Sequence, residues 1–256
     1  MSRAETFLAG AVQIAGPLTR QQERIVAVKL HPDAISVAQL HPSLDEWQMD
    51  RLVSWSLDRN IGREPVQENY PYLVNEIASA ADEAAVDGVD AGISIPASLF
   101  DTRTLTLPFM SADELADEAK EPEFWEEFDP ELGNLMGRVM RYQVVYSNEN
   151  EDKTMVLLSS IAVGDLERYR SLLLDANLLP VVMENEVFSL VNGVFARLSA
   201  DDQFKPFFII HLCPGNNLVV AHYRGRLMTH RINISDFDEA LLSCLLYTSP
   251  SPRDRG

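Results

Sequence analysis

The chain has 256 residues and a formal net charge of −18, from 21 basic and 39 acidic side chains. This charge argues against a nucleic-acid partner, because phosphate recognition needs a basic surface, and it disfavours adhesion to anionic lipid. Hydrophobic residues make up 46% of the chain, enough for one large core or two small ones. The two cysteines, Cys213 and Cys244, give neither a disulfide framework nor a metal-ligand spacing, and no apolar run reaches the ~18 residues of a membrane span.

Two stretches of the sequence share one layout: a β-rich apolar run, a turn containing proline, and a second β-rich run. They are IVAVKL-HPDA-ISVAQL, within Arg24–Leu40, and FFIIHL-CPGNN-LVVAHY, within Pro206–Tyr223. Such runs, rich in Val, Ile and Phe and bounded by turn residues, are typical of strands, so each stretch is predicted to form a β-hairpin. Glu46–Leu57 and Arg226–Ile234 are predicted to add a third strand to each hairpin.

The segments between the hairpins carry periodic patterns of their own. Asn69–Val86 places Leu73, Ile77, Ala80 and Ala84 on one face at helical spacing, which predicts a helix. The other predicted elements are strands at Asp90–Ile95, Thr102–Leu107, Val139–Tyr146, Thr154–Ala162 and Val181–Met183, and helices at Ser111–Phe128, Asp165–Leu174 and Glu186–Leu198.

An acidic stretch, Asp113–Asp129, lies within the helix predicted from Ser111 to Phe128. Ser111 and Glu114, three residues apart, form a capping-box pattern that marks the start of this helix. A glycosidase needs two carboxyl groups in differently shifted environments, whereas these carboxylates alternate around one solvated helix. The stretch is therefore interpreted as the outer face of the helix.

Each predicted hairpin resembles a phosphate-binding hairpin of an actin-type ATPase, two of which face each other across a nucleotide cleft. Such hairpins normally carry an acidic residue at the end of the first strand, which holds hydrated Mg²⁺, and small residues in the turn, whose N–H groups approach the phosphates. Lys29 and His211 stand where these carboxylates are expected, and the first turn contains no glycine. The resemblance thus implies the scaffold of the site without its ATPase chemistry.

The two turns still offer polar groups to a phosphate, each with a structural alternative. His31 could donate a hydrogen bond to an anion or be an exposed turn residue, and His211 could equally be a satisfied histidine at a strand end. The backbone of the Gly-Asn-Asn turn could cradle an anion or simply close a hairpin. The candidate phosphate-binding residues are Lys29, His31, His211, Gly215, Asn216 and Asn217.

The order of elements from Ile25 to Ser243 resembles the PilM family of type IV pilus assembly proteins. Three segments carry the resemblance: an R-x-L-x-L-P strand followed by an M-S-x-x-E-L helix start, a Y-x-x-L-x-x-x-A-x-L-x-P helix, and a V-x-E-x-x-x-F-x-L helix. The matching residues are Arg103, Leu105, Leu107 and Pro108; Met110, Ser111, Glu114 and Leu115; Tyr169, Leu172, Ala176, Leu178 and Pro180; and Val182, Glu184, Phe188 and Leu190.

The resemblance implies an α/β, actin-like (ribonuclease-H-like) fold related to the cell-division protein FtsA, with an inserted α/β subdomain and its C-terminal part missing. The tail resembles a translated sequencing adapter, with a Ser/Pro linker as the alternative, so the natural protein is expected to continue past residue 243. The expected division is an N-terminal extension at 1–23, a first actin-like subdomain at 24–100 with return elements at 163–200, the inserted subdomain at 101–162, the start of a second actin-like half at 201–243, and an adapter-derived tail at 244–256.

The resemblance also implies a cytoplasmic scaffold, peripheral at the inner membrane, without a membrane span of its own. Its partner would be a PilN-like single-span membrane protein, whose N-terminal peptide lies in a groove by the inserted subdomain; self-association is left open. The candidate groove residues are Arg103, Leu105, Leu107 and Trp125. For Trp125 the alternative is burial against the inserted sheet.

Members of this family usually bind ATP, but the residues at positions 29 and 211 predict a degenerate site. We expect weak or no Mg-ATP binding, no catalytic residue and no metal site, with ATP and Mg²⁺ as the alternative cofactors. Two other functions remain open. One is an active actin-type ATPase that binds Mg-ATP through unusual residues, and the other is the cytoplasmic region of a GspL-like type II secretion protein.

Overall fold

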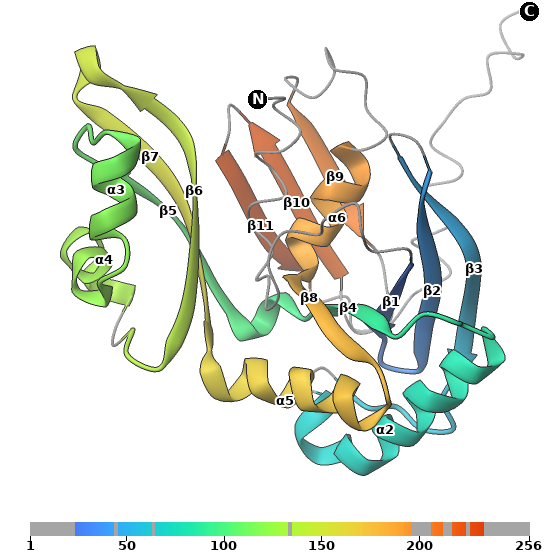
Figure 1. Cartoon of the computed structure of the whole chain (residues 1–256). Helices are drawn as coiled ribbons and strands as arrows, with labels where there is room; N and C mark the ends of the chain where they lie inside the picture. Colours follow the sequence, from blue (N-terminus) through green and yellow to red (C-terminus); the bar gives the residue numbers. More distant parts are fainter. Residues whose placement is uncertain are drawn as a thin grey trace, which may run out of the picture.

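The computed structural model describes residues 24–43, 46–62, 65–132, 135–195, 206–211, 217–223 and 226–232. The described strands form three separate sheets (Figure 1). One has five strands in the order β3-β2-β1-β4-β8, and the other two have three strands each, in the orders β5-β7-β6 and β11-β10-β9. Among the described residues, no helix is long and apolar enough to cross a bilayer.

The five-stranded sheet is mixed. β1, β2 and β3 pair antiparallel as a meander, and β4 and β8 then add in parallel to β1. This arrangement agrees with the ribonuclease-H-like fold that the family resemblance implies. The strands are β1 (Ile25–Leu30), β2 (Ala34–Ser43), β3 (Glu46–Ser56), β4 (Asp90–Ile95) and β8 (Leu179–Asn185).

Two helices, α2 (Pro65–Glu83) and α5 (Val163–Asp175), pack against each other over the five-stranded sheet. Alternation along β1 and β2 turns one side chain in two toward the helices, which buries these residues in the main core. The sequence predicts this helix only from Asn69, one turn too late, since α2 begins at Pro65. The helix is kinked at Asn69, two residues before Pro71. Core members from both layers are Val26, Val28, Ile35, Val37, Leu73, Ile77, Leu172 and Leu173.

The inserted subdomain is a second α/β layer with its own core. Its sheet is covered on one face by two short helices (Figure 1). The predicted single helix from Ser111 to Phe128 is wrong: it breaks between the two helices, because Pro122 takes the first position of the second one and disfavours helical backbone just before itself. The capping box at Ser111 is confirmed. The elements are β5 (Phe100–Leu107), α3 (Ala112–Glu118), α4 (Pro122–Phe128), β6 (Arg138–Asn148) and β7 (Lys153–Ala162).

The third sheet is attached to the first through α6 (Glu186–Phe195). Val187 and Val191 of this helix pack on Val220, with Phe207 and Ile209 around them. Both predicted strands of the second hairpin are confirmed, although its turn lies outside the described residues. The three strands are β9 (Phe207–His211), β10 (Asn217–Tyr223) and β11 (Arg226–Ile232), all antiparallel.

Candidate functional site

The carboxyl ends of the parallel strands β1, β4 and β8 meet at one edge of the five-stranded sheet. Open α/β sheets bind ligands at such an edge, because loops and helix N-termini converge there. Lys29 lies at the end of β1, Ala97 just beyond β4, and Glu186 directly after β8, where it opens α6. Three segments that are far apart in the sequence thus meet at one point.

Lys29 and Glu186 form an ion pair at this edge. The Lys29 Nζ lies 2.7 Å from Glu186 Oε2, and the Glu186 side chain is only 3% exposed. The second carboxylate oxygen, Oε1, accepts a hydrogen bond of 2.8 Å from the backbone N–H of Ala97. A buried carboxylate is costly unless it is paired and hydrogen-bonded, and here the ammonium and the N–H meet both needs.

Two half-buried histidines lie beside this pair. His31 Nε2 is 3.0 Å from Ser36 Oγ on β2. Burial lowers the pKa of His31, helped by the nearby charge of Lys29 and by His211. Burial and Lys29 likewise lower the pKa of His211, which comes from the third sheet. Burial thus favours the neutral form of both imidazoles, and the electrostatic influence of His211 on His31 indicates that the ends of the two hairpins lie near each other. Asn217 begins β10, whereas Gly215 and Asn216 lie outside the described residues.

The donors at this edge do not fit a hydrated Mg²⁺ ion, which the actin-type resemblance implies. Mg²⁺ takes oxygen ligands in near-octahedral geometry, usually with one or two carboxylates. The described carboxylate best placed for this role is Glu186, and it already holds the Lys29 ammonium. No group of three or more His, Cys, Asp or Glu side chains in the described ranges is arranged to hold a metal.

The junction between β8 and α6 carries two more polar side chains that the protein interior holds in place. Glu184 accepts hydrogen bonds of 2.9 Å from Ser189 Oγ and from Asn192 Nδ2, and burial raises its pKa. Asn185 caps α6 by accepting from the N–H of Val187 at 2.9 Å.

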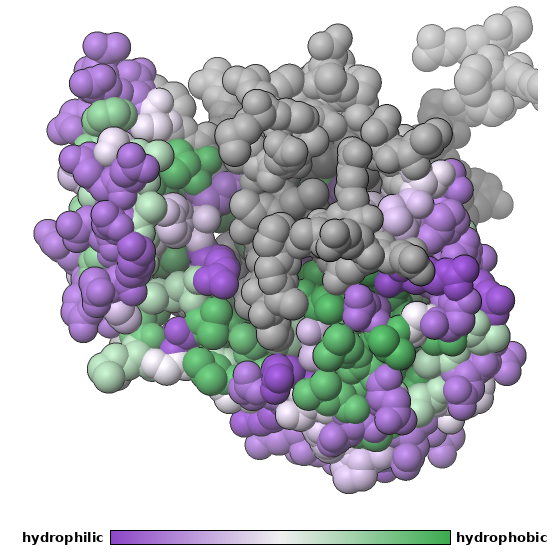
Figure 2. Space-filling view, in the orientation of Figure 1, coloured by the Kyte–Doolittle hydropathy of each residue, from purple (hydrophilic) through white to green (hydrophobic). Residues whose placement is uncertain are grey.

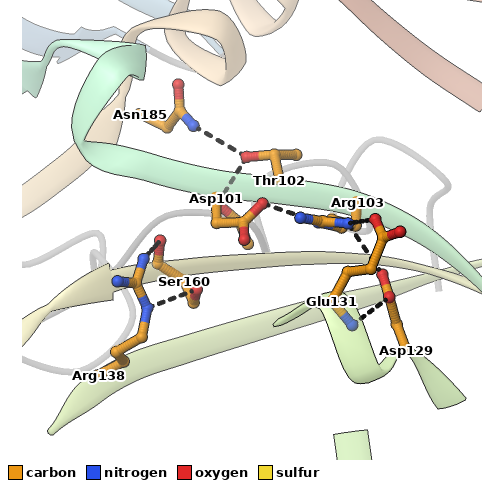
Figure 3. A network of polar contacts seen from close by, with 9 residues as sticks. Asp101, Thr102, Arg103, Asp129, Glu131, Arg138, Ser160 and Asn185 are labelled. Carbon is orange, nitrogen blue, oxygen red and sulfur yellow. Dashed lines mark hydrogen bonds and ion pairs between the residues drawn. The ribbon is translucent and has the colours of Figure 1, made fainter. Parts of the chain in front are cut away.

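Asn185 also links this junction to the inserted subdomain. Its Nδ2 donates to Thr102 Oγ1 at 3.4 Å, and Thr102 in turn lies 3.1 Å from Ser159 Oγ on β7 (Figure 3). The residue that caps α6 therefore also contacts the inserted sheet.

Three of the four predicted groove residues lie inside the inserted subdomain. Leu105, Leu107 and Trp125 belong to its core, and the Trp125 indole N–H donates to the carbonyl of Ala119 at 3.1 Å. For Trp125, burial against the inserted sheet is the alternative that the sequence leaves open. In this arrangement these side chains have almost no surface with which to contact a partner.

Arg103, the fourth predicted groove residue, is partly exposed. It forms ion pairs with Asp101 at 3.0 Å, Asp129 at 3.2 Å and Glu131 at 3.3 Å (Figure 3). One guanidinium is thus surrounded by three carboxylates, so the cluster keeps a negative surplus.

Comparison with solved structures identifies the architecture. The chain has an actin-like fold. It is similar to a chain of a "PilM-PilN type IV pilus biogenesis complex" at 16% identity with a TM-score of 0.68, over 89% of this chain and 67% of that one. The cytoplasmic domain of EpsL, an inner-membrane component of the Vibrio cholerae type II secretion system, matches at 12% identity with a TM-score of 0.49, over 91% and 78% of the two chains. A Bacteroides thetaiotaomicron protein with an actin-like ATPase fold and unknown function matches at 13% identity with a TM-score of 0.43, over the same shares.

No protein-family model and no curated protein matches the sequence. At these identities the structural likeness concerns the fold, and it confirms the predicted α/β, actin-like class. The matched part of the chain spans about two thirds of the chain in the PilM–PilN complex.

Glu186 and Asn185, the central residues of this sheet edge, carry little signal in the sequence. Glu186 is 157 positions from its partner Lys29, and an acidic residue at the start of a helix is ordinary. The nearest hint is the V-x-E pattern, but it marks Glu184, whose carboxylate points to α6 rather than to Lys29.

Proposed function

We propose that this chain is a scaffold of a type IV pilus or related secretion platform. It binds the cytoplasmic N-terminal peptide of a PilN-like single-span inner-membrane protein and works without Mg-ATP. The observation that carries the proposal is the fold shared with a chain of the PilM–PilN complex, at a TM-score of 0.68 over 89% of this chain. The protein would then act in the cytoplasm, at the inner face of the membrane.

The charge of the inserted subdomain supports such a partner. Cytoplasmic segments next to a membrane span are enriched in Lys and Arg, so the peptide is expected to be basic. Hydrophilic side chains crowd the surface over α3 and α4 (Figure 2), and Lys120 is the single basic residue of these helices and their connection. Acidic residues exposed there are Asp113, Glu114, Asp117, Glu118, Glu121, Glu123 and Glu127.

The cleft supports the second part of the proposal. Lys29 faces the carboxylate that a metal ion would need, and both histidines beside it are neutral. Hydrated Mg²⁺ would therefore have to compete with the Lys29 ammonium for Glu186, because the first strand of the first hairpin ends without a carboxylate. We expect partner binding to be the same with and without Mg-ATP.

A titration with the partner peptide tests the proposal. Calorimetry would use a synthetic peptide with the sequence of the cytoplasmic N-terminus of a PilN-like protein. We expect binding that weakens as salt rises, because exposed charges are screened. The double variant E123K/E127K should bind about tenfold more weakly, since two charges on the acidic surface are reversed. The matched control E68K/E83K, on α2, should stay within about twofold.

Two results would contradict the proposal. One is the absence of peptide binding to the folded wild-type chain at both low and moderate salt. The other is micromolar, Mg²⁺-dependent ATP binding in the same calorimeter, which would favour the actin-type ATPase instead.

A further inference from the structure

We propose that Lys29 is a resident cation of the cleft. Its ammonium permanently fills, at Glu186, the place that a divalent metal would take in a metal-dependent cleft of this fold. The inference deepens the proposed function and rests on it for the claim that the scaffold works without a bound metal.

Glu186 needs a cation because it is buried. Its side chain is 3% exposed, and its two oxygens are taken by the Lys29 Nζ at 2.7 Å and the Ala97 N–H at 2.8 Å. The N-terminus of α6 contributes only a partial positive charge. Without Lys29, the carboxylate would have to become protonated, draw in water, or bind another cation.

The groups around Glu186 suit Mg²⁺ and Ca²⁺ poorly. Burial favours the neutral form of His31 and His211, and imidazole nitrogens are not the oxygen ligands that these ions prefer, whereas Asp33 lies in the exposed turn of the first hairpin. Glu184 is close in sequence, but its oxygens are used by Ser189 and Asn192 on α6. A metal ion at Glu186 would therefore lie against the Lys29 ammonium, and only removal of that ammonium would admit it.

Glu186 in turn holds the start of the inserted subdomain. Ala97 opens the short 3-10 turn Ala97–Leu99, which leads directly into β5. Its N–H is fixed by Glu186, whose charge is balanced by Lys29. A bound metal would balance the charge of Glu186 only while it is bound, whereas the Lys29 ammonium balances it at all times. The inserted subdomain is thus held in place constitutively.

Replacing the ammonium by a carboxylate tests the proposal. In K29D, the new carboxylate at position 29 and Glu186 can share a divalent ion. We expect MgCl₂ or CaCl₂, at about ten times the Kd, to raise the Tm of K29D by about 4 °C. The Tm of the wild-type chain and of the matched surface variant K120D should not respond, with ionic strength held constant by NaCl.

A double-mutant cycle decides the question if K29D does not fold. K29M and E186Q should each lower the Tm by about 5 °C or more, because each leaves one charge unpaired. The double variant K29M/E186Q should recover at least half of this loss, because no buried charge remains. Strictly additive losses would overturn the proposal.

Two results of the metal titrations would also overturn the proposal. One is a folded K29D whose Tm changes with neither metal, and the other is a wild-type chain whose Tm rises as much as that of K29D. These readouts need no partner peptide. A failure of the proposed partner binding is therefore distinguishable from a failure of this inference.

Discussion

The third sheet, β9–β11, repeats the hairpin plan of β1–β3 but not its burial. In the first strand of the first hairpin, Val26 and Val28 are 0% and 2% exposed, because α2 and α5 cover that side of the sheet. In the first strand of the second hairpin, Phe208 and Ile210 are 74% and 64% exposed. Similar local sequences therefore form similar strands in very different surroundings.

The two hairpins also differ in the residue that ends the first strand. Lys29 is fixed by a buried carboxylate, whereas His211 stays neutral beside it. The difference teaches that the hairpin pattern specifies only the scaffold. The elements packed against each hairpin decide how stable it is and which chemistry its end can support.

The largest expected effect comes from matched truncations in β1 and β9. Val28→Ala removes two buried methyl groups from the main core, so we expect it to lower the free energy of unfolding by about 2.5 kcal/mol. Ile210→Ala removes exposed surface and should change it by less than about 0.5 kcal/mol. Urea unfolding measures both values. If both variants lost the same free energy of unfolding, the face of β9 that carries Ile210 would have to be covered in solution.

A smaller effect is expected where the third sheet joins α6. Val220 is fully buried, and among the described residues its cluster has three buried members, so this cluster can relax around a cavity better than the main core can. Val220→Ala should cost about 1.5 kcal/mol, and the loss should appear as faster amide exchange in β9 and β10. Exchange in β1 and β4 should be unchanged. A uniform acceleration across both sheets would mean that they unfold as one unit.

The smallest effect concerns the two histidines at the strand ends. Burial and Lys29 lower the pKa of His31 and of His211, against the opposing influence of Glu186 and, for His31, of Asp33. A group whose pKa is lowered by folding contributes stability that is present above its unfolded pKa, about 6.5, and is lost as the pH falls. Urea midpoints of the wild-type chain should therefore drop between pH 7 and pH 5, and the drop should be smaller in H31Q/H211Q. An identical pH profile for both chains would contradict this assignment.

Local sequence pattern was sufficient to predict the strands, whereas the fold class followed from the order of the elements and the family resemblance that it carries. Runs of Val, Ile and Phe between turn residues mark β1, β2, β9 and β10 because a strand shows its period within a few residues. The break between α3 and α4 was not foreseen, although Pro122 announces it, because the apolar and acidic periodicity continues across it. At this point the helix-breaking effect of one proline outweighed the helical periodicity of its neighbours.

The contacts of the candidate site could not be predicted in the same way. The sequence identifies Lys29 as a departure from the expected carboxylate, but it does not reveal Glu186 as its partner. That pair depends on β8 lying beside β4 and on α6 beginning without a loop. The burial of Leu105 and Trp125 likewise follows from how α4 packs on β5, which no local pattern specifies.

The junction of β7 and α5 has a mechanical consequence. β7 ends at Ala162 and α5 begins at Val163, so a strand of about 33 Å continues without a joint into a helix of about 20 Å. The strand and the helix are therefore expected to move together as one bent unit. A hydrogen bond of 2.9 Å from the Val163 N–H to the carbonyl of Gly137 stabilises the junction between them. A rotation of about 5° at α5 would swing the far end of β7 by about 3 Å. Any force on the outer tip of the inserted subdomain is thereby carried into the helix layer beneath the first sheet.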